Sequence, residues 1–153
     1  MITHYPFDTL GGANHGWLNA KHHFSFANYY DPKKMGFGEL LVINDDRIAP
    51  NTGFGKHPHD NMEIITFVRK GAISHEDSQG NKGRTTAGNV QVMSAGTGIM
   101  HSEFNHEDEE TNIFQIWIIP KSRDIEPKWG SAEFPTTSTT EKLKLLVSGN
   151  NDA

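Results

Sequence analysis

His57-Pro58-His59-Asp60-Asn61-Met62-Glu63 leads directly into Ile64-Ile-Thr-Phe-Val68, a run rich in β-branched and aromatic residues. Further along the chain, Met100-His101-Ser102-Glu103-Phe104 has the same i, i+2 spacing of polar residues. Residues at i and i+2 of a β-strand point to the same face. Two neighbouring strands with these pairs would aim three imidazoles and one carboxylate at a single point. The sequence therefore predicts a metal site carried on strands, because this ligand set suits a divalent transition metal and leaves positions open.

The spacing alone leaves the carboxylate ligand undecided. If the strand is regular, positions 57, 59, 61, 63, 65 and 67 share one face, so Glu63 points inward together with His57 and His59. Glu63 and Glu103 are then both eligible as the fourth ligand. Four apolar residues are candidate walls of a substrate pocket, or simply core residues: Ile65, Phe67, Met93 and Phe114.

The remaining histidines are weaker candidates for a ligand role. His75 stands close to the turn signal Ser78-Gln-Gly-Asn81 and is expected at the surface or behind the ligands. His106 precedes the acidic run Glu107-Asp-Glu-Glu110, which predicts a solvated loop. Four others occupy an N-terminal stretch that we expect to be irregular: His4, His15, His22 and His23.

Short apolar runs separated by turn signals predict an all-β fold with antiparallel strands. Strands are expected at 39–43, 63–68, 90–93, 113–119 and 142–147. Turns are expected at 44–46, 70–71, 78–81, 87–89 and 96–98, where Gly, Asn, Asp and Ser gather. The longest candidate helix, at 17–21, has a weak pattern, and the polar segment 135–140 is expected to be a surface loop or linker.

Length and composition exclude several classes of protein. The 153 residues carry a formal net charge of -5 and are expected to form one domain over residues 1–153. No basic stripe predicts a nucleic-acid surface, and the absence of cysteine excludes disulfides, thiolate metal sites and a cysteine nucleophile. The start of the chain lacks the pattern of a secretory signal, and no apolar run has the length of a membrane span. We therefore expect a cytoplasmic protein without a membrane segment.

The candidate ligands also fall within a longer pattern of glycines and polar residues. The order Gly53, His57, His59, Glu63, Gly71 and then Gly88, Gly96, His101, Asn105 resembles the two cupin motifs. The blocks at 22–32, 75–81 and 93–103 resemble the pirin family, and 57–63 is similar to bacterial pirin-like quercetin dioxygenases. This resemblance covers nearly the whole chain. It implies a single cupin-type antiparallel β-barrel (a jelly roll, or double-stranded β-helix) equivalent to the N-terminal half of two-domain pirins, with the C-terminal cupin absent.

The resemblance implies metal ligation by His57, His59, His101 and Glu103, and not by Glu63. Iron is the usual metal, so one divalent ion is expected, Fe²⁺ before Mn, Co, Ni, Cu or Zn. The implied activity is flavonol (quercetin) 2,3-dioxygenation, in which Glu103 accepts the proton of the flavonol 3-hydroxyl, dioxygen is the second substrate and carbon monoxide is expelled. Other members imply an alternative: a non-catalytic iron-binding regulator of transcription or metabolism that acts through a protein partner. Because imidazole binds a metal only when neutral, affinity should fall below about pH 6.

Overall fold

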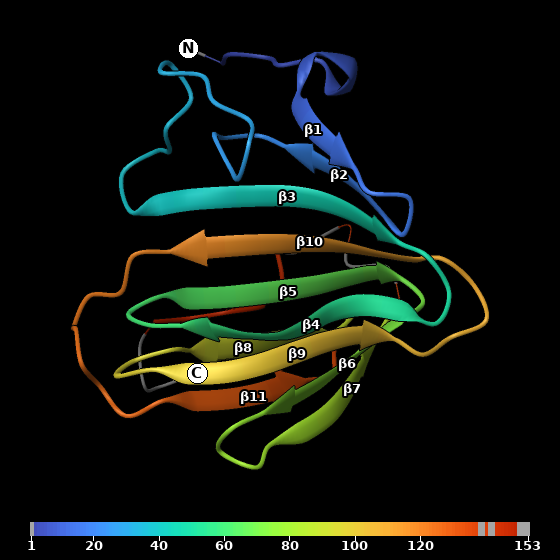
Figure 1. The fold of residues 1–153 in the computed structure, drawn as a ribbon, viewed down its shortest axis with the longest axis vertical. Coiled ribbons are helices and arrows are strands. Elements are labelled where there is room, and N and C mark those ends of the chain that lie inside the picture. The colour runs from blue at the N-terminus through green and yellow to red at the C-terminus, as the bar shows by residue number, and fades with distance from the viewer. Residues whose placement is uncertain (1, 138–139, 141–142, 150–153) are drawn as a thin grey trace.

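The computed structural model describes residues 2–137, 140 and 143–149, and over these residues the chain is built almost entirely of strands (Figure 1). A short 3-10 helix, η1 (Phe7–Thr9), precedes them. The strands are β1 (Gly11–Asn14), β2 (Leu18–His22), β3 (Leu40–Ile48), β4 (Thr52–His59), β5 (Glu63–Lys70), β6 (Ala72–Asp77), β7 (Lys82–Thr86), β8 (Val90–Ser94), β9 (Ile99–Asn105), β10 (Thr111–Ile118) and β11 (Lys128–Ala132). No helix in this part of the chain is long and apolar enough to cross a membrane.

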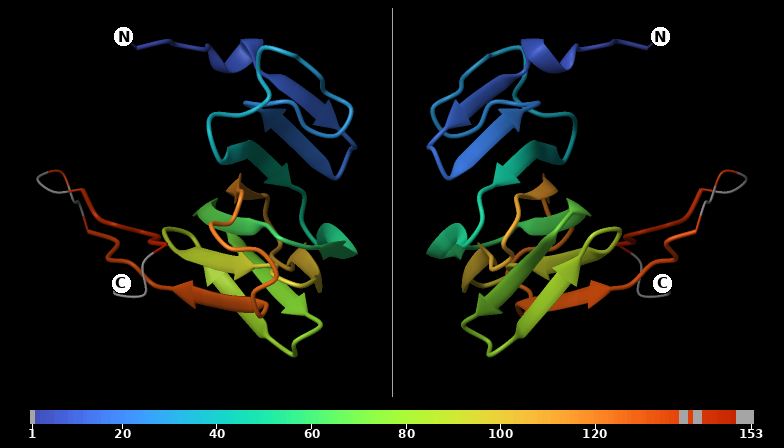
Figure 2. Two further views of the ribbon diagram at one scale, coloured as in Figure 1. Left: turned by 90° about the vertical axis from the view of Figure 1, so that its left-hand side faces the viewer. Right: turned by 90° about the vertical axis from the view of Figure 1, so that its right-hand side faces the viewer.

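The strands form two antiparallel sheets. The larger sheet has the order β1-β2-β3-β10-β5-β8-β11, and the smaller sheet has the order β4-β9-β6-β7. Side chains of β9 bond to side chains of β5, β8 and β10, so the two sheets face each other across the interior. The first two strands and the loop after them stand at one end of the molecule, and the described part of the chain after β11 extends away from the sheets (Figure 2). This arrangement confirms the predicted all-β, antiparallel fold of the cupin type.

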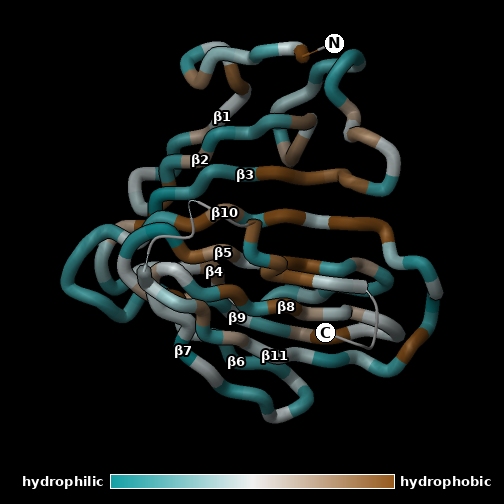
Figure 3. Tube along the Cα trace, turned by 180° about the vertical axis from the view of Figure 1, so that it is seen from behind, coloured by the Kyte–Doolittle hydropathy of each residue, from teal (hydrophilic) through white to brown (hydrophobic). Residues whose placement is uncertain are grey.

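Apolar side chains from the inner faces gather into two separate clusters. One contains Leu18, Ala20, Ile48, Val68, Ile73 and Ile113. The other contains Ile64, Met93, Ala95 and Ile99. Apolar residues follow the central strands, whereas the connecting loops are largely hydrophilic (Figure 3). Burial of these side chains is the main favourable contribution to folding.

A row of polar side chains crosses the larger sheet between the two clusters. Strand register places His22 opposite Asn44, Asn44 opposite Gln115, Gln115 opposite Thr66 and Thr66 opposite Gln91. All five are buried, and we call them the polar row. The first cluster contains Val68 and Ile113, which are paired on one side of the row, and the second contains Ile64 and Met93, paired on the other. The interior is therefore two apolar layers with a polar layer between them.

Four of the expected strands are confirmed. The runs 39–43, 63–68, 90–93 and 113–119 fall largely within β3, β5, β8 and β10. The expected turn at 44–46 is wrong, because Asn44, Asp45 and Asp46 all lie inside β3 and are buried. Asn44 bonds to His22, and Asp45 pairs with Arg69, so tertiary contacts outweigh the weak strand preference of these residues.

The glycine-containing turns are confirmed, and one of them requires glycine. Gly80, Gly88 and Gly96 have positive φ angles of 88°, 87° and 47°. At Gly96 a Cβ atom would lie 2.0 Å from the carbonyl oxygen of Ile125. The turn between β8 and β9 therefore has no room for a side chain at Gly96, and β9 begins directly after this turn, at Ile99.

Three other expectations have mixed outcomes. The helix expected at 17–21 is wrong: β2 alternates buried Leu18, Ala20 and His22 with outward side chains, which is a strand period. The strand expected at 142–147 is also wrong over 143–147, where the chain is irregular and Leu143 is fully exposed; Lys142 lies outside the described residues. The segment 135–140 is an exposed loop at 135–137 and 140, and residues 138 and 139 lie outside the described residues.

Candidate metal centre

Three imidazoles from β4 and β9 converge on one point. The two strands pair antiparallel with His57 directly opposite His101, and the alternation of β4 places His59 on the same face as His57. The potential ligand atoms of these three rings all lie within 4.8 Å of one another. The Nε2 atoms of His57 and His101 are 3.0 Å apart. Within the described residues, these three form the one group of His, Cys, Asp or Glu close enough to hold a metal together.

The orientation of His57 leaves a ring nitrogen free to bind a metal. Its Nδ1 atom lies 2.7 Å from the carbonyl oxygen of Gly55. Because a carbonyl oxygen can only accept, Nδ1 carries the proton and Nε2 keeps its lone pair. A backbone carbonyl that fixes the tautomer in this way is the usual support of a metal-bound histidine.

Burial keeps the other two rings neutral. It lowers the pKa of His59 to about 4, with a further lowering by the neighbouring His57. It lowers the pKa of His101 to about 3, helped by His57 and His59 and opposed by Asp77. Protons should therefore compete for these two rings only near pH 4, well below the onset near pH 6 expected from an ordinary imidazole.

Glu103 lies beside the polar row, outside the group of three imidazoles. It is 1% exposed. Its Oε1 atom accepts hydrogen bonds from Thr66 Oγ1 at 3.1 Å and Gln91 Nε2 at 2.6 Å, and its Oε2 atom accepts one from Gln115 Nε2 at 2.8 Å. An ionised carboxylate offers about four acceptor positions. Three are filled, so one acceptor position is left, on Oε2. Burial raises the pKa of Glu103, while His75 and the hydrogen bond from Thr66 oppose the increase.

Glu63, the rival carboxylate, belongs to the other sheet. Residues 60–62 separate β4 from β5, and Asn61 has a φ of 45°, so the shared face predicted for positions 57 to 67 ends after His59. In β5 the buried side chains are Ile64, Thr66 and Val68, and Glu63 instead accepts a hydrogen bond from Ser94 Oγ at 2.5 Å.

The same break in the strand changes the expected pocket walls. Ile65 and Phe67 are half-buried and lie on the face of β5 opposite to its buried residues. Phe114 is also half-buried and packs under the guanidinium of Arg69, at 4.3 Å from its ring centroid. Met93 is the one candidate wall that lies inside, in the second apolar cluster.

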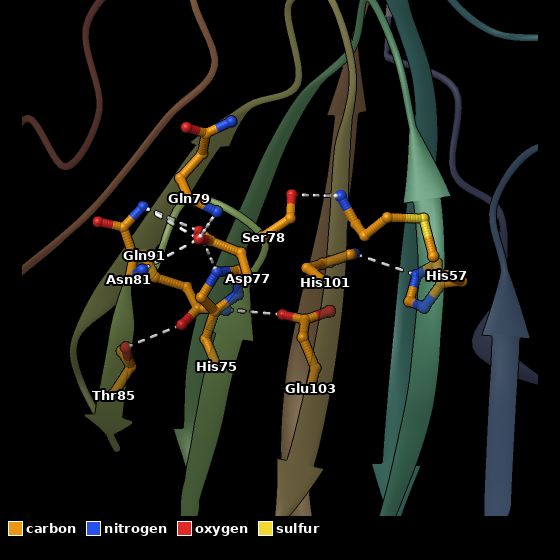
Figure 4. A network of polar contacts seen from close by, with 11 residues as sticks. His57, His75, Asp77, Ser78, Gln79, Asn81, Thr85, Gln91, His101 and Glu103 are labelled. Atoms are coloured by element: carbon orange, nitrogen blue, oxygen red, sulfur yellow. Dashed lines mark hydrogen bonds and ion pairs between the residues drawn. The ribbon is translucent and has the colours of Figure 1, made fainter.

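His75 lies behind His101, which confirms the second of its two expected positions. It is 1% exposed, and its ring centroid is 5.3 Å from that of His101. Its Nε2 atom donates to Asp77 Oδ2 at 3.0 Å (Figure 4). Its ring stacks on Trp129, with 4.8 Å between the ring centroids. Asp77 is itself fixed by hydrogen bonds from Asn81 and Gln79. The His75 ring is therefore held by Asp77 at its Nε2 atom and by Trp129 on its face.

The other histidines are outside the centre. His106 is exposed, as predicted for a solvated loop, and its ring stacks on Phe104. His4 and His15 are also exposed, and His23 is half-buried. His22 differs from the expectation of an irregular stretch, because it is the buried last residue of β2 and bonds to Asn44 through Nδ1 at 2.9 Å.

A buried acid near the centre was not recognised from the sequence. Asp46 is 2% exposed, and within the described part of the chain its Oδ1 atom has no hydrogen-bond partner. Burial, together with the charges of Glu103 and Asp45, raises the pKa of Asp46 to about 7. Its polar type predicted a turn, but the alternation Val42, Asn44, Asp46, Ile48 is the signal that could have placed it on an inner face.

His59 borders a pocket on the surface. The pocket has a volume of about 380 Å³ and is lined by Pro58, His59 and Asp60 on one side and by Gly98, Ile99 and Met100 on the other. Trp117 approaches His59 edge to face, with 5.0 Å between the ring centroids. The histidine group is therefore accessible from solvent at His59 and covered at His101. The fold and this site together define a cupin-type protein with a three-histidine centre.

Comparison with known proteins identifies the family. A family model described as Pirin matches residues 6–118. A pirin-like protein of Caulobacter vibrioides is 64% identical over 152 residues, which cover 99% of this chain and 66% of that protein. A quercetin 2,3-dioxygenase of Escherichia coli is 54% identical over 125 residues, 81% of this chain and 54% of that protein. The crystal structure of the bacterial pirin YhhW from Escherichia coli in complex with nickel(II) has a TM-score of 0.82 at 50% identity, and the match covers 86% of this chain and 58% of that one.

This chain belongs to the pirin family. It spans 54% to 66% of the length of the two curated relatives named above. The donor set fits a divalent transition metal, because three imidazole nitrogens from two strands meet in a partly covered site. The nickel complex of the related pirin agrees with a divalent ion.

The raised pKa of Asp46 predicts a pH-dependent effect of the substitution Asp46→Asn. The folded state holds this proton more tightly than the unfolded state does, so stability falls as pH rises from about 4 to about 7. Asn cannot ionise, so the variant should melt a few degrees higher than the wild type at about pH 8, and the difference should shrink towards pH 4. Thermal unfolding of metal-free protein across this range checks it. Asp45→Asn, which breaks the pair with Arg69, should lower the melting temperature instead. An effect of Asp46→Asn that is constant with pH would contradict the assignment.

Proposed function

We propose that this chain binds one divalent metal through His57, His59, His101 and Glu103, and that it cleaves flavonols such as quercetin with dioxygen. The observation that supports this most directly is the convergence of three imidazoles beside a buried carboxylate with a single acceptor position left. The names of the related dioxygenases supply the substrate class. We expect Fe²⁺ to be the bound metal. We expect the protein to act in the cytoplasm.

In this reaction the metal and Glu103 have different roles. When bound, the metal supplies Lewis acidity that lowers the pKa of a coordinated hydroxyl. Glu103 accepts the proton of the flavonol 3-hydroxyl at Oε2, and the increase in its pKa through burial makes it a better base than an exposed glutamate. The open acceptor position on Oε2 is the one that would hold the metal, and the same oxygen would accept this proton.

The surroundings of His59 suit a flat aromatic substrate. The pocket beside His59 opens to solvent, and Trp117, which does not line this pocket, meets the His59 ring edge to face with 5.0 Å between the centroids. Aromatic side chains of this kind offer large rigid surfaces to planar rings. The buried side of the centre, around His101, keeps bulk water away from the carboxylate.

A regulator that acts through a protein partner is the second candidate. Its supporting observation is a set of exposed aromatic and apolar side chains in the N-terminal part of the chain: Tyr5, Phe7, Tyr30, Met35 and Phe37. Exposed apolar residues that gather on one region are typical of interaction surfaces. The two candidates share the metal ligands, so turnover separates them.

Loss of a histidine should remove the metal. We expect His57→Ala and His101→Ala to lose most of the bound divalent ion, since each removes one of three converging nitrogens. Elemental analysis of purified protein and titration with Ni²⁺ measure it. His106→Ala is the matched control, because this exposed ring lies outside the group. Full occupancy in both site variants would rule out this site.

The two carboxylates should behave differently. Glu63→Gln should keep its metal, because Glu63 bonds to Ser94 on the other sheet. Glu103→Gln should lose metal or change the absorption spectrum of the Co²⁺ form, because it replaces an anionic ligand by a neutral one. The comparison is made at one metal concentration for both variants. If Glu63→Gln had the larger effect, the assignment of Glu103 as a ligand would be wrong.

Turnover of quercetin tests the activity itself. The protein is reconstituted separately with iron, manganese, cobalt, nickel, copper and zinc, and flavonol absorbance is followed together with carbon monoxide. We expect oxygen-dependent release of carbon monoxide that is abolished by His101→Ala. Loss of absorbance that persists in this variant, or occurs without carbon monoxide, is autoxidation, and the regulator would then be the better description.

A further inference from the structure

The two glutamines that bond to Glu103 are themselves held in place. Gln91 accepts a hydrogen bond from Thr85 Oγ1 at 3.1 Å through its amide oxygen, and Gln115 accepts one from Trp117 Nε1 at 3.2 Å in the same way. An amide has one acceptor end and one donor end. Because the indole N–H of Trp117 can only donate, the Gln115 amide must turn its NH₂ group towards Glu103. The Thr85 hydroxyl donates to Gln91 in this structure, but a hydroxyl can also accept, so the fixed orientation is set at Gln115.

This orientation determines how Glu103 can act. With both NH₂ groups and the Thr66 hydroxyl donating, three acceptor positions of the carboxylate are filled and one remains on Oε2. If the Gln115 amide turned over, its oxygen would face a carboxylate oxygen, which is repulsive, and two positions on Oε2 would be open. The indole N–H of Trp117 disfavours the same turned-over state from the other end of the amide, because it would then face the NH₂ group of Gln115.

Trp117 also contacts the histidine side of the centre. Its ring meets His59 edge to face at 5.0 Å, while its N–H meets Gln115. No other residue among those described has a hydrogen bond or ring contact to both His59 and Gln115. The ring and the N–H of one side chain thus join the imidazoles to the carboxylate.

We propose that Trp117 is a positioning residue that acts through Gln115 to hold Glu103 with a single open acceptor position, while its ring fixes the plane of His59. Gln91, held by Thr85, has the same role at Oε1. This inference rests on the proposed metal function. In this inference Trp117 affects the metal only indirectly: its N–H orients Gln115, and Gln115 positions Glu103.

The test compares two Trp→Phe variants by the absorption spectrum and affinity of bound Co²⁺. Trp117→Phe keeps an aromatic ring against His59 and removes the N–H. Trp129→Phe is the matched control, because the buried Trp129 Nε1 atom has no hydrogen-bond partner among the described residues, and its ring contact with His75 can be kept. Trp117→Phe should alter the Co²⁺ spectrum and weaken binding by about 10–100-fold, as expected for supporting groups behind a ligand. Trp129→Phe should leave both unchanged.

A second variant tests the route of the effect. Gln115→Met removes the donor to Oε2 at nearly constant size and should change the spectrum in the same way as Trp117→Phe. In the Gln115→Met protein, adding Trp117→Phe should change the spectrum no further, because the N–H has lost its partner. Circular dichroism melts verify that each variant is folded. If Gln115→Met does not fold, the comparison of Trp117→Phe with Trp129→Phe still tests the inference.

The outcomes separate this inference from the proposed function. If the wild type binds Co²⁺ and both His variants lose it, but Trp117→Phe matches Trp129→Phe, the positioning role is wrong and the metal function stands. Additive effects of Trp117→Phe and Gln115→Met would show that Trp117 acts by another route and would also overturn the inference. If the wild type binds no Co²⁺, Ni²⁺ or Fe²⁺, both the proposed function and the inference fail.

Discussion

The carboxylate of Glu103 lies in the interior between two sheets, and the polar residues around it are arranged to satisfy it. An ionised carboxylate away from water is strongly unfavourable unless several hydrogen bonds replace its hydration. Here the donors are Thr66, Gln91 and Gln115, one from each of three adjacent strands of the larger sheet. They reach the same carboxylate only because β10, β5 and β8 are paired in one particular register. A slip of one residue in any of these strands would replace a polar donor by an outward-facing side chain. Glu103 therefore constrains the alignment of the sheet opposite to it.

The histidines depend on a different constraint, the pairing of β4 with β9. His57 and His101 are far apart in the chain but directly opposite across this pair. The loop between β8 and β9 turns at Gly96, where a side chain would meet the carbonyl oxygen of Ile125. β9 begins directly after this turn, and the period of two in the strand places His101 and Glu103 on the same, inward face. One strand thus carries both His101 of the imidazole group and the Glu103 carboxylate.

Features that depend on neighbouring residues could be predicted from the sequence, whereas features that depend on contacts between distant strands could not. The histidine pairs were found because a period of two is a local property of a strand and holds over three residues. The extension of that period to Glu63, Ile65 and Phe67 failed, because the positive φ of Asn61 breaks the strand and sends the chain into the other sheet. The turn expected at 44–46 failed for the opposite reason: Asn44 and Asp45 find partners in His22 and Arg69, which lie far away in the sequence. Periodicity locates side chains within one strand, whereas the partners that make a buried polar residue acceptable belong to other strands.

The positions that violate the apolar pattern are the ones that define the site. Along β5 and β10, one inward position is polar and inward positions next to it are apolar. Thr66 stands between Ile64 and Val68 in β5, and Gln115 follows Ile113 in β10. Taken singly, each such residue weakens the prediction of a core strand. Taken together, they fall at one level across five strands, and three of them donate hydrogen bonds to Glu103. Polar interruptions that align in register are expected where an interior has been arranged for chemistry at the expense of packing. Asp46, two residues after Asn44 on β3, is a buried acid whose Oδ1 atom has no hydrogen-bond partner among the described residues. Burial and the charges of Glu103 and Asp45 raise its pKa, whereas Glu103 accepts three hydrogen bonds from the polar row.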